Sequence, residues 1–148
     1  MRQLSFLLLV LFTFSLFLSS CKKEDELSNR DKLIGKWKYI TITSTQYKNN
    51  NFVETQTVNF IEATREYKSN GIYDDFFPTS SLPDLAEDGT WKLTDNDTKL
   101  LIGTKGNPFV DTLYIKHLTD KEIRVLSINE YTEDGNKYRF EQELYLKK

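Results

Sequence analysis

Apolar and polar positions alternate along most of this chain with the two-residue period of a β-strand. The clearest alternation lies in residues 137–146. Its apolar positions share one face: Tyr138, Phe140, Leu144 and Leu146. No segment after residue 36 has the period of a long helix. The pattern therefore predicts an all-β domain.

Eight strands are predicted, each a run of apolar and β-branched residues bounded by a polar turn. They span residues 36–45, 59–68, 72–77, 89–93, 99–103, 109–117, 122–130 and 137–146. One short helix is predicted before them, over 28–34. Ser28 or Asn29 can cap its start, and Gly35 can end it in the left-handed conformation.

The lengths of the connections predict which end of the sheet is closed. Residues 69–71 ("SNG") form the tightest predicted hairpin, because Asn-Gly tolerates the positive φ of a type I′ turn. "DNDT" and "LTDK" are also tight, whereas the alternate connections, above all 46–56 and 78–88, are as long or longer. In a meander the two sets lie at opposite ends. We therefore expect one tightly turned, closed end and one mouth surrounded by longer loops, where binding is usual.

Eight consecutive strands joined by short connections favour an up-and-down antiparallel barrel. Closing eight strands removes the exposed edges and leaves room for side chains or one small ligand. A β-sandwich is the alternative, but the spacing of the strands requires no long crossover.

The first twenty residues have a different character from the rest. A charged start at Arg2 is followed by an apolar run from Leu4 to Leu18, which is typical of a secretory signal peptide and short for a membrane-spanning helix. The quartet 18–21 ("LSSC") follows at once and resembles the bacterial lipobox. The resemblance implies cleavage before Cys21 and acylation of its thiol. The alternative is an unmodified cysteine in an ordinary signal peptide.

The segment after Cys21 is polar and predicts a flexible tether, so the expected divisions are a signal peptide (1–20), a lipidated tether (21–28) and one domain (29–148). Residues 22–26 ("KKEDE") resemble the Lys-then-acidic export signal of surface lipoproteins of Bacteroidota; a solvated linker is the alternative. We expect a bacterial envelope protein held at the outer membrane by lipid, with surface or periplasmic orientation left open. Because the first strand starts at the closed end, the mouth should point away from the membrane.

Three segments together resemble one family. In "LIGKW", Gly35 and Trp37 follow the short helix as in the Gly-x-Trp motif of lipocalins, and "EYKSNGIY" and "GTWKL" are similar to segments of small bacterial lipocalin-like lipoproteins. The resemblance covers nearly the whole mature domain and implies that Trp37 packs across the closed end. The arginine that caps this tryptophan in larger lipocalins is not carried over, because Arg139 lies at the wrong end of the last strand. The short chain and the missing C-terminal helix argue against a large internal pocket.

Candidate ligand-binding residues lie on the first strand and near the expected mouth. They are Tyr39, Thr41, Tyr47, Phe76, Phe77, Phe109 and Tyr131. Aromatic residues at the bases of loops can grip an apolar or sugar-like ligand; the alternative is that they fill the upper core. With Trp37 facing inward, alternation places Tyr39 and Thr41 on the same lining face, unless a bulge reverses it.

Composition argues against several functions. Lys and Arg total 20 against 22 Asp and Glu, with no long basic run, so a nucleic-acid partner is not expected. One cysteine and one histidine leave no disulfide framework and no Cys/His-rich metal site. His117 is expected beside the tight "LTDK" turn, far from the mouth, and no carboxylate pair stands out. We predict no metal, no cofactor and no enzymatic activity.

Two functional hypotheses follow. The first is a lipid-anchored, lipocalin-like barrel that binds a small amphipathic ligand in or at its mouth. The second is a structural or interaction module whose filled barrel presents loops to a protein partner. A connected cavity of roughly 300 Å³ or more favours the first, and a solid core favours the second.

Overall fold

The structure is a computed structural model that describes residues 27–78, 85–104 and 106–148. The predicted signal peptide, Cys21 and nearly all of the predicted tether lie outside the described residues. Within these three stretches, no helix is long and apolar enough to cross a membrane.

The described chain contains one short helix and nine strands. They are α2 (Asn29–Leu33), β1 (Gly35–Lys48), β2 (Asn51–Asn59), β3 (Thr64–Tyr67), β4 (Ile72–Phe77), β5 (Leu85–Thr94), β6 (Lys99–Thr104), β7 (Asn107–Leu118), β8 (Glu122–Glu133) and β9 (Asn136–Lys147). Ser28 caps α2, because its Oγ accepts a hydrogen bond from the N–H of Asp31 at 3.1 Å. Gly35 follows the helix with φ of 120°, a conformation that favours glycine.

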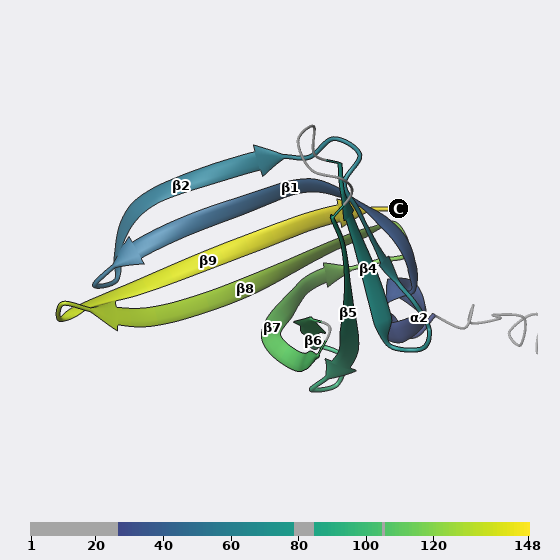
Figure 1. The fold of residues 1–148 in the computed structure, drawn as a ribbon. Coiled ribbons are helices and arrows are strands. Elements are labelled where there is room, and N and C mark those ends of the chain that lie inside the picture. The colour runs from purple at the N-terminus through teal and green to yellow at the C-terminus, as the bar shows by residue number, and fades with distance from the viewer. Residues whose placement is uncertain (1–26, 79–84, 105) are drawn as a thin grey trace, which may run out of the picture.

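Eight of the strands close into a barrel (Figure 1). The order is β1-β3-β4-β5-β6-β7-β8-β9, all neighbours are antiparallel, and β9 pairs with β1 to complete the circle. This confirms the predicted eight-stranded, up-and-down antiparallel barrel. The ninth strand, β2, lies outside the circle and pairs with the outer part of β1.

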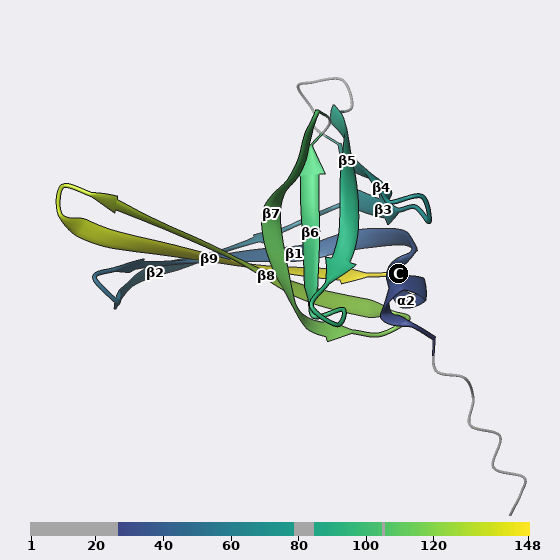
Figure 2. The same ribbon diagram turned by 90° about the horizontal axis from the view of Figure 1, so that it is seen from below.

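Four strands continue well past the barrel and form a sheet that projects from it (Figures 1 and 2). This extension consists of β2 and the outer parts of β1, β8 and β9, in the order β2-β1-β9-β8. The predicted strand over 59–68 is too long, since it contains β3 but also residues 60–63, which belong to no strand; β2 is a separate, unpredicted strand on the same edge of β1. Residues 60–63 separate β2 from β3 and include Glu62 with a positive φ of 67°.

The predicted long connection over 46–56 is a tight hairpin instead. Asn49 and Asn50 have φ of 51° and 65°, as a type I′ turn requires, and the β8–β9 hairpin turns in the same way at Asp134 and Gly135. The two tips are tied together. Asn49 donates its backbone N–H to the carbonyl of Lys137 at 2.7 Å, and its Oδ1 accepts the N–H of Lys137 at 2.9 Å.

The type I′ turn predicted at Asn70-Gly71 is wrong. Gly71 has φ of 82° but Asn70 does not have a positive φ, and the N–H of Gly71 bonds to the carbonyl of Lys68 at 3.1 Å. This is a type I turn followed by a glycine bulge, the usual form of a three-residue hairpin loop. The positive φ values of a type I′ turn occur instead at Asn96 and Asp97, with φ of 54° and 62°.

The prediction that longer connections lie opposite the tight turns is mostly wrong. Two residues separate β1 from β2, β6 from β7 and β8 from β9, against three or four in each turn at the other end, and only β4 and β5 are farther apart in sequence. The β3–β4, β5–β6 and β7–β8 turns share one end with α2, whereas β4, β6 and β8 run toward the other end, from which the extension projects (Figure 2). We call these the closed end and the mouth.

A bulge in β1 changes which residues face inward. Tyr39 pairs with Leu146, but Thr41 pairs with Tyr145, so Ile40 is an extra residue. Tyr39 and Leu146 are buried in the core, and Thr41 turns to the opposite, outer face with Tyr145. The expectation that Tyr39 and Thr41 line one face is therefore wrong.

The closed end is densely filled. The largest fully buried side chains are Trp37, Trp91, Tyr67, Leu33, Leu100, Ile123 and Val125. Trp37 donates its indole N–H to the carbonyl of Leu33 at 2.7 Å and so ties β1 to α2. The ammonium of Lys148 lies 4.7 Å from the centre of the Trp37 ring and donates to the carbonyls of Lys32 and Ile34. The cation over this tryptophan is thus the residue after β9.

Candidate functional site at the mouth of the barrel

A buried ion pair lies between the closed end and the mouth. Arg65 on β3 and Asp75 on β4 are direct partners across the sheet, with 7% and 3% of their surface exposed. The Nε of Arg65 donates to Asp75 Oδ1 at 2.7 Å, and its Nη2 donates to Oδ2. The two-point geometry holds the guanidinium in a fixed orientation, and Asp75 neutralises its charge.

Tyrosines surround this pair. The hydroxyl of Tyr39 donates to Asp75 Oδ1 at 3.1 Å, and that of Tyr67 accepts from Arg65 Nη1 at 3.4 Å. The ring of Tyr73 lies 4.4 Å from the guanidinium carbon. Burial raises the pKa of both Tyr39 and Tyr67, so these hydroxyls stay protonated and act as hydrogen-bonding groups.

Part of the Arg65 guanidinium remains available. Of its five N–H groups, two bond to Asp75 and one to Tyr67, and the other two have no acceptor among the described residues. Arg65 lines a cavity of about 160 Å³ at the mouth. The volume is that of about five water molecules at ~30 Å³ each. The cavity suits a small molecule or one end of a larger one.

The wall of this mouth cavity has both apolar and polar residues. Its apolar residues are Ile102, Leu113 and Leu144, and its polar residues besides Arg65 are Asp111, Ser127, Asn129 and Gln142. A lining that mixes apolar and hydrogen-bonding side chains suits an amphipathic ligand.

A groove of about 260 Å³ on the extension adjoins the mouth cavity at Gln142, which lines both. Its other residues are Ser44, Thr45, Gln46, Glu54, Gln56 and Phe140. Farther out, Tyr131 stacks on Tyr138 and on Phe140, with ring centres 5.0 and 5.8 Å apart. A polar track thus runs from the barrel along the sheet to an aromatic cluster.

The structure brings only some of the predicted ligand-binding residues together. Tyr39 and Phe77 lie 5.2 Å apart by ring centres and contact Phe60 on the inner side. Phe76 has 37% of its surface exposed, and Thr41 faces outward.

The remaining predicted residues are dispersed. Tyr47 lies on the extension with the guanidinium of Arg139 4.4 Å from its ring centre. Tyr131 lies on the opposite face of the same sheet, since it pairs with Tyr138, whereas Tyr47 pairs with Arg139. Phe109 belongs to β7, but its side chain lies outside what the structure describes.

The sequence analysis missed Arg65 and Asp75, although a signal for both was present. Tyr67 and Tyr73 are apolar anchors of β3 and β4, and alternation from each one directs the residue two positions away to the same inner face. An arginine and an aspartate on one inner face, on adjacent strands, indicate a buried pair.

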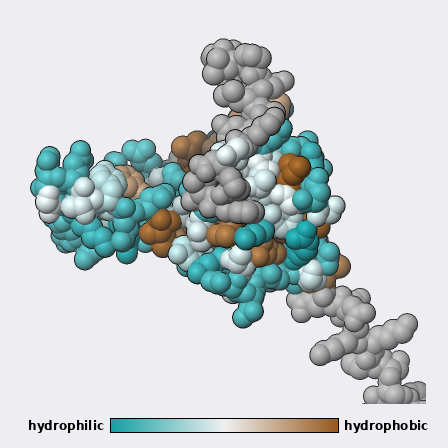
Figure 3. Space-filling view, turned by 60° about the horizontal axis from the view of Figure 1, so that its bottom comes forward, coloured by the Kyte–Doolittle hydropathy of each residue, from teal (hydrophilic) through white to brown (hydrophobic). Residues whose placement is uncertain are grey.

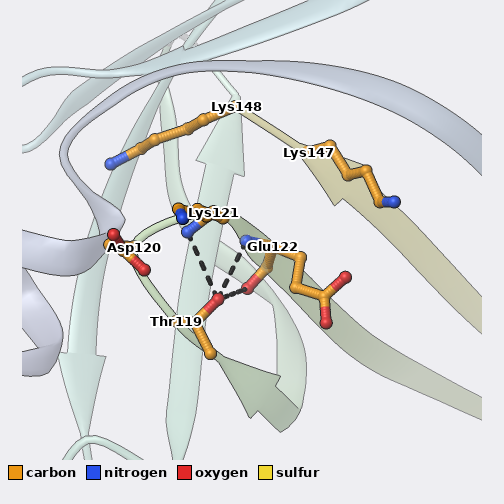
Figure 4. Close-up of a pocket in the computed structure, with 6 residues that line it drawn as sticks. All are labelled: Thr119, Asp120, Lys121, Glu122, Lys147 and Lys148. Carbon is orange, nitrogen blue, oxygen red and sulfur yellow. Dashed lines mark hydrogen bonds between the residues drawn. The ribbon is translucent and has the colours of Figure 1, made fainter.

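A larger hollow lies at the other end of the molecule. About 530 Å³ of open depression lies between the β7–β8 turn and the end of β9, lined by Thr119, Asp120, Lys121, Glu122, Lys147 and Lys148 (Figure 4). Several of its groups already have partners among the described residues. Thr119 holds the turn through the N–H groups of Lys121 and Glu122, and Lys148 holds the α2 carbonyls. We place the candidate site at the mouth, where the buried Arg65 lines the cavity.

His117 lies beside this depression, and its Nε2 is 3.3 Å from Glu122 Oε1. A hydrogen bond from the Tyr145 hydroxyl lowers the pKa of Glu122, with a smaller contribution from His117. No group of three or more His, Cys, Asp or Glu residues in the described stretches is arranged to hold a metal ion.

Comparison with known proteins gives one informative likeness. No protein-family model and no curated protein matches the chain. Apocrustacyanin C1, a lipocalin, superimposes with a TM-score of 0.52 over 79% of this chain. The fold is lipocalin-like. The match has 18% sequence identity and covers 62% of the apocrustacyanin chain, so it shows the fold alone.

A second solved structure, an uncharacterized protein from Bacteroides eggerthii, matches over 74% of this chain and 98% of its own. The TM-score is 0.44 and the sequence identity is 17%.

Proposed function

We propose that this chain is a lipid-anchored, lipocalin-like lipoprotein of the bacterial envelope that binds a small amphipathic molecule at the mouth of its barrel. The observation that supports binding is the mouth cavity of about 160 Å³, which is lined by Arg65, a residue with N–H groups to spare, and by apolar residues that include Leu113 and Leu144.

The cavity selects for a ligand with two different ends. An apolar portion packs against Ile102, Leu113 and Leu144, and an acceptor oxygen receives the free N–H groups of Arg65. Because Asp75 already neutralises Arg65, the ligand is selected by hydrogen bonding more than by net charge. A longer ligand extends past Gln142 into the groove.

Short amphiphiles test the binding proposal on the full-length chain in detergent. Hexanol and hexanoate should each raise the unfolding temperature, because a ligand that binds only the folded state stabilises it by mass action. Hexylamine should not, since an ammonium offers no acceptor to Arg65. Ser127→Phe, which fills the cavity, should abolish the effect.

Ile128→Phe is the matched control, because Ile128 neighbours Ser127 but faces the other side of β8. It should retain the stabilisation. Equal stabilisation of the parent and Ser127→Phe would show that the amphiphiles bind elsewhere and would remove the proposed site.

The proposed lipid anchor rests on the lipobox-like quartet 18–21. The proposed orientation of the barrel relative to the membrane rests on the position of α2. Because the described chain enters at the closed end, lipid on Cys21 leaves the mouth pointing away from the membrane. Cys21→Ser should release the protein from membranes of a Gram-negative host, and a variant still retained there would contradict the lipid anchor. Protease treatment of intact cells should release the domain if it is displayed on the surface.

One observation favours an interaction module as the second candidate. The closed end is solid, with Trp37, Trp91 and Tyr67 fully buried, and the mouth cavity is smaller than the ~300 Å³ usual for a ligand site. Native mass spectrometry of the full-length protein separates the two functions. A small molecule that co-purifies with the parent but not with Ser127→Phe supports ligand binding, and a clean apo mass favours the interaction module.

A further inference from the structure

The outer edge of β2 has no partner strand among the described residues. β1 covers its inner edge from Asn51 to Asn59, and β2 is the terminal strand of the sheet. All nine residues of β2 are exposed. A free strand edge offers backbone N–H and C=O groups to any other strand that can reach it.

The composition of β2 leaves this edge unguarded. Glu54 is the only charged residue in the strand, and its other residues are Thr, Val, Gln, Asn and Phe. Natural proteins usually protect free edges with charges or prolines. The other free edge, on the outer part of β8 beyond Ser127, carries Glu130 and Glu133. The two edges of the extension thus differ in their protection.

Backbone geometry identifies the groups that point outward. Phe60 donates its N–H to the carbonyl of Ile40 at 3.1 Å, so alternation along the pair directs the backbone groups of Thr55, Thr57 and Asn59 away from β1. The side chains agree with this assignment. Thr43 and Thr57 lie close enough to hydrogen-bond at 3.1 Å, as expected for a pair that exchanges no backbone bonds.

We propose that β2 pairs with β2 of a second copy of this chain. The two strands run antiparallel about a twofold axis perpendicular to the sheet, and the two four-stranded extensions join into one continuous sheet. Such an axis keeps each face of the sheet on the same side. The outward backbone groups belong to odd-numbered residues. The two edges can therefore hydrogen-bond only when odd-numbered residues of one copy face odd-numbered residues of the other.

The register follows from counting outward groups. An axis at Thr57 pairs Thr57 of one copy with Thr57 of the other, and Thr55 of each copy with Asn59 of the other. All three outward residues then take part in about six backbone hydrogen bonds. An axis at Gln56 engages about four. An axis at Thr55 requires the bulged residue Val53 to pair regularly, and an axis at Glu54 places two carboxylates opposite each other. The axis at Thr57 is the best of the four.

The visible surface agrees with contact through the edge. Figure 3 shows the projecting extension as largely hydrophilic or neutral, without a broad apolar patch on the face in view. Ile128 and Tyr131 on β8 are exposed, and so are four apolar side chains along or just beyond β2, which are Phe52, Val53, Val58 and Ile61. These four would flank the new pair of strands. Their positions favour a strand as the partner of this edge.

Oligomeric state provides the first test, on the full-length chain in detergent. The parent should sediment with the mass of two chains, and Thr57→Lys should halve that mass because it places two ammonium groups opposite each other on the axis. Thr43→Lys is the matched control. It loses the same Thr43–Thr57 hydrogen bond and adds the same charge to the same face, but one strand away from the edge, so it should remain dimeric.

Cysteine cross-linking tests the register. In the proposed pairing, two Cα atoms at position 57 lie ~5.5 Å apart, within disulfide range, whereas two at position 56 are diagonal neighbours ~7–8 Å apart. Thr57→Cys should therefore give a reducible dimer, and Gln56→Cys should not. The parent chain, whose only cysteine is Cys21, reports any dimer that forms through that residue.

Three results would overturn the proposal. One is a monomeric parent chain over a range of protein concentrations. Another is a dimer that survives Thr57→Lys, because the copies then meet elsewhere. The third is a monomeric chain that retains a strand of a different protein on β2. A cross-link at position 56 in place of position 57 would overturn the register. Because the β2 edge is separate from the mouth cavity, failure here leaves the ligand proposal unaffected.

Discussion

Arg65 and Asp75 face each other across β3 and β4, and their side chains form a two-point ion pair inside the barrel. Such a pair costs desolvation of both charges, and its attraction repays that cost only while both partners are present. The interior of this barrel therefore depends on a matched pair as well as on apolar packing.

Removal of one partner should be much more harmful than removal of both. Asp75→Leu leaves a buried guanidinium without its carboxylate and should cost ~3–5 kcal/mol of unfolding free energy. The double variant Arg65→Met with Asp75→Leu should recover most of that loss. Urea unfolding with matched slopes measures both. Losses that simply add in the double variant would show that the two residues act independently.

Alkaline pH should weaken the fold through the buried tyrosines. Burial raises the pKa of Tyr39 and Tyr67, so above pH ~10 the unfolded chain loses phenolic protons that the folded chain keeps. The unfolded state then binds fewer protons, and stability falls as pH rises.

Phenolate absorbance provides the measurement. We expect part of the tyrosine absorbance change to appear only with unfolding, and Tyr39→Phe to make stability less dependent on pH above ~10. A complete tyrosine titration in the folded protein near the ordinary pKa would contradict this.

Gly89 should tolerate no side chain. A Cβ at this position would lie 2.3 Å from the carbonyl oxygen of Gly103 and 2.3 Å from the ring of Tyr73. Because one obstacle is backbone, Gly89→Ala should cost ~3 kcal/mol, the upper end of the usual range for overpacking, and the additional change Tyr73→Phe should not restore the loss. Thermal unfolding tests this against Thr90→Ala, the neighbouring control. A loss at Gly89→Ala no larger than that control would argue against the close approach.

Lys148 should stabilise the closed end specifically. Its ammonium donates to the carbonyls of Lys32 and Ile34 and lies over the Trp37 ring. Lys148→Met should cost about 1 kcal/mol, whereas Lys147→Met should change stability little. The protection of α2 amides against hydrogen exchange is the direct readout. Equal losses of stability in Lys148→Met and Lys147→Met would show that the lost positive charge, and not the contacts of Lys148, determines the effect.

Alternation along the strands predicts the barrel well because each barrel strand buries one face. The predicted bounds for 72–77 coincide with β4, and those of the last two strands differ by a few residues at most. β2 was missed because both of its faces are exposed, so no apolar alternation marks it, and the run of asparagines at 49–51 resembles a loop. The apolar alternation that marks a strand in the sequence arises from burial of one face, and β2 has no buried face.

The site was harder to predict than the fold. One extra residue in β1, Ile40, reverses the faces of everything beyond it, and nothing in the local sequence marks that bulge. The cation over Trp37 comes from Lys148, a position that the family pattern did not indicate. Arg65 and Asp75 required two strands to be considered together, because neither residue is distinctive until their pairing is known.

The hydrogen bonds from Asn49 to Lys137 have a mechanical consequence. They fasten the tips of two hairpins, so β1, β2, β8 and β9 deflect as one stiff arm. From Ile42 to Lys48 that arm reaches ~20 Å at ~3.4 Å per residue. Its root is the β1–β9 pairing that closes the barrel. A force on the tips is therefore transmitted to the β1–β9 pairing that closes the barrel. A partner that binds the arm would in this way also strain the strands beside the mouth cavity.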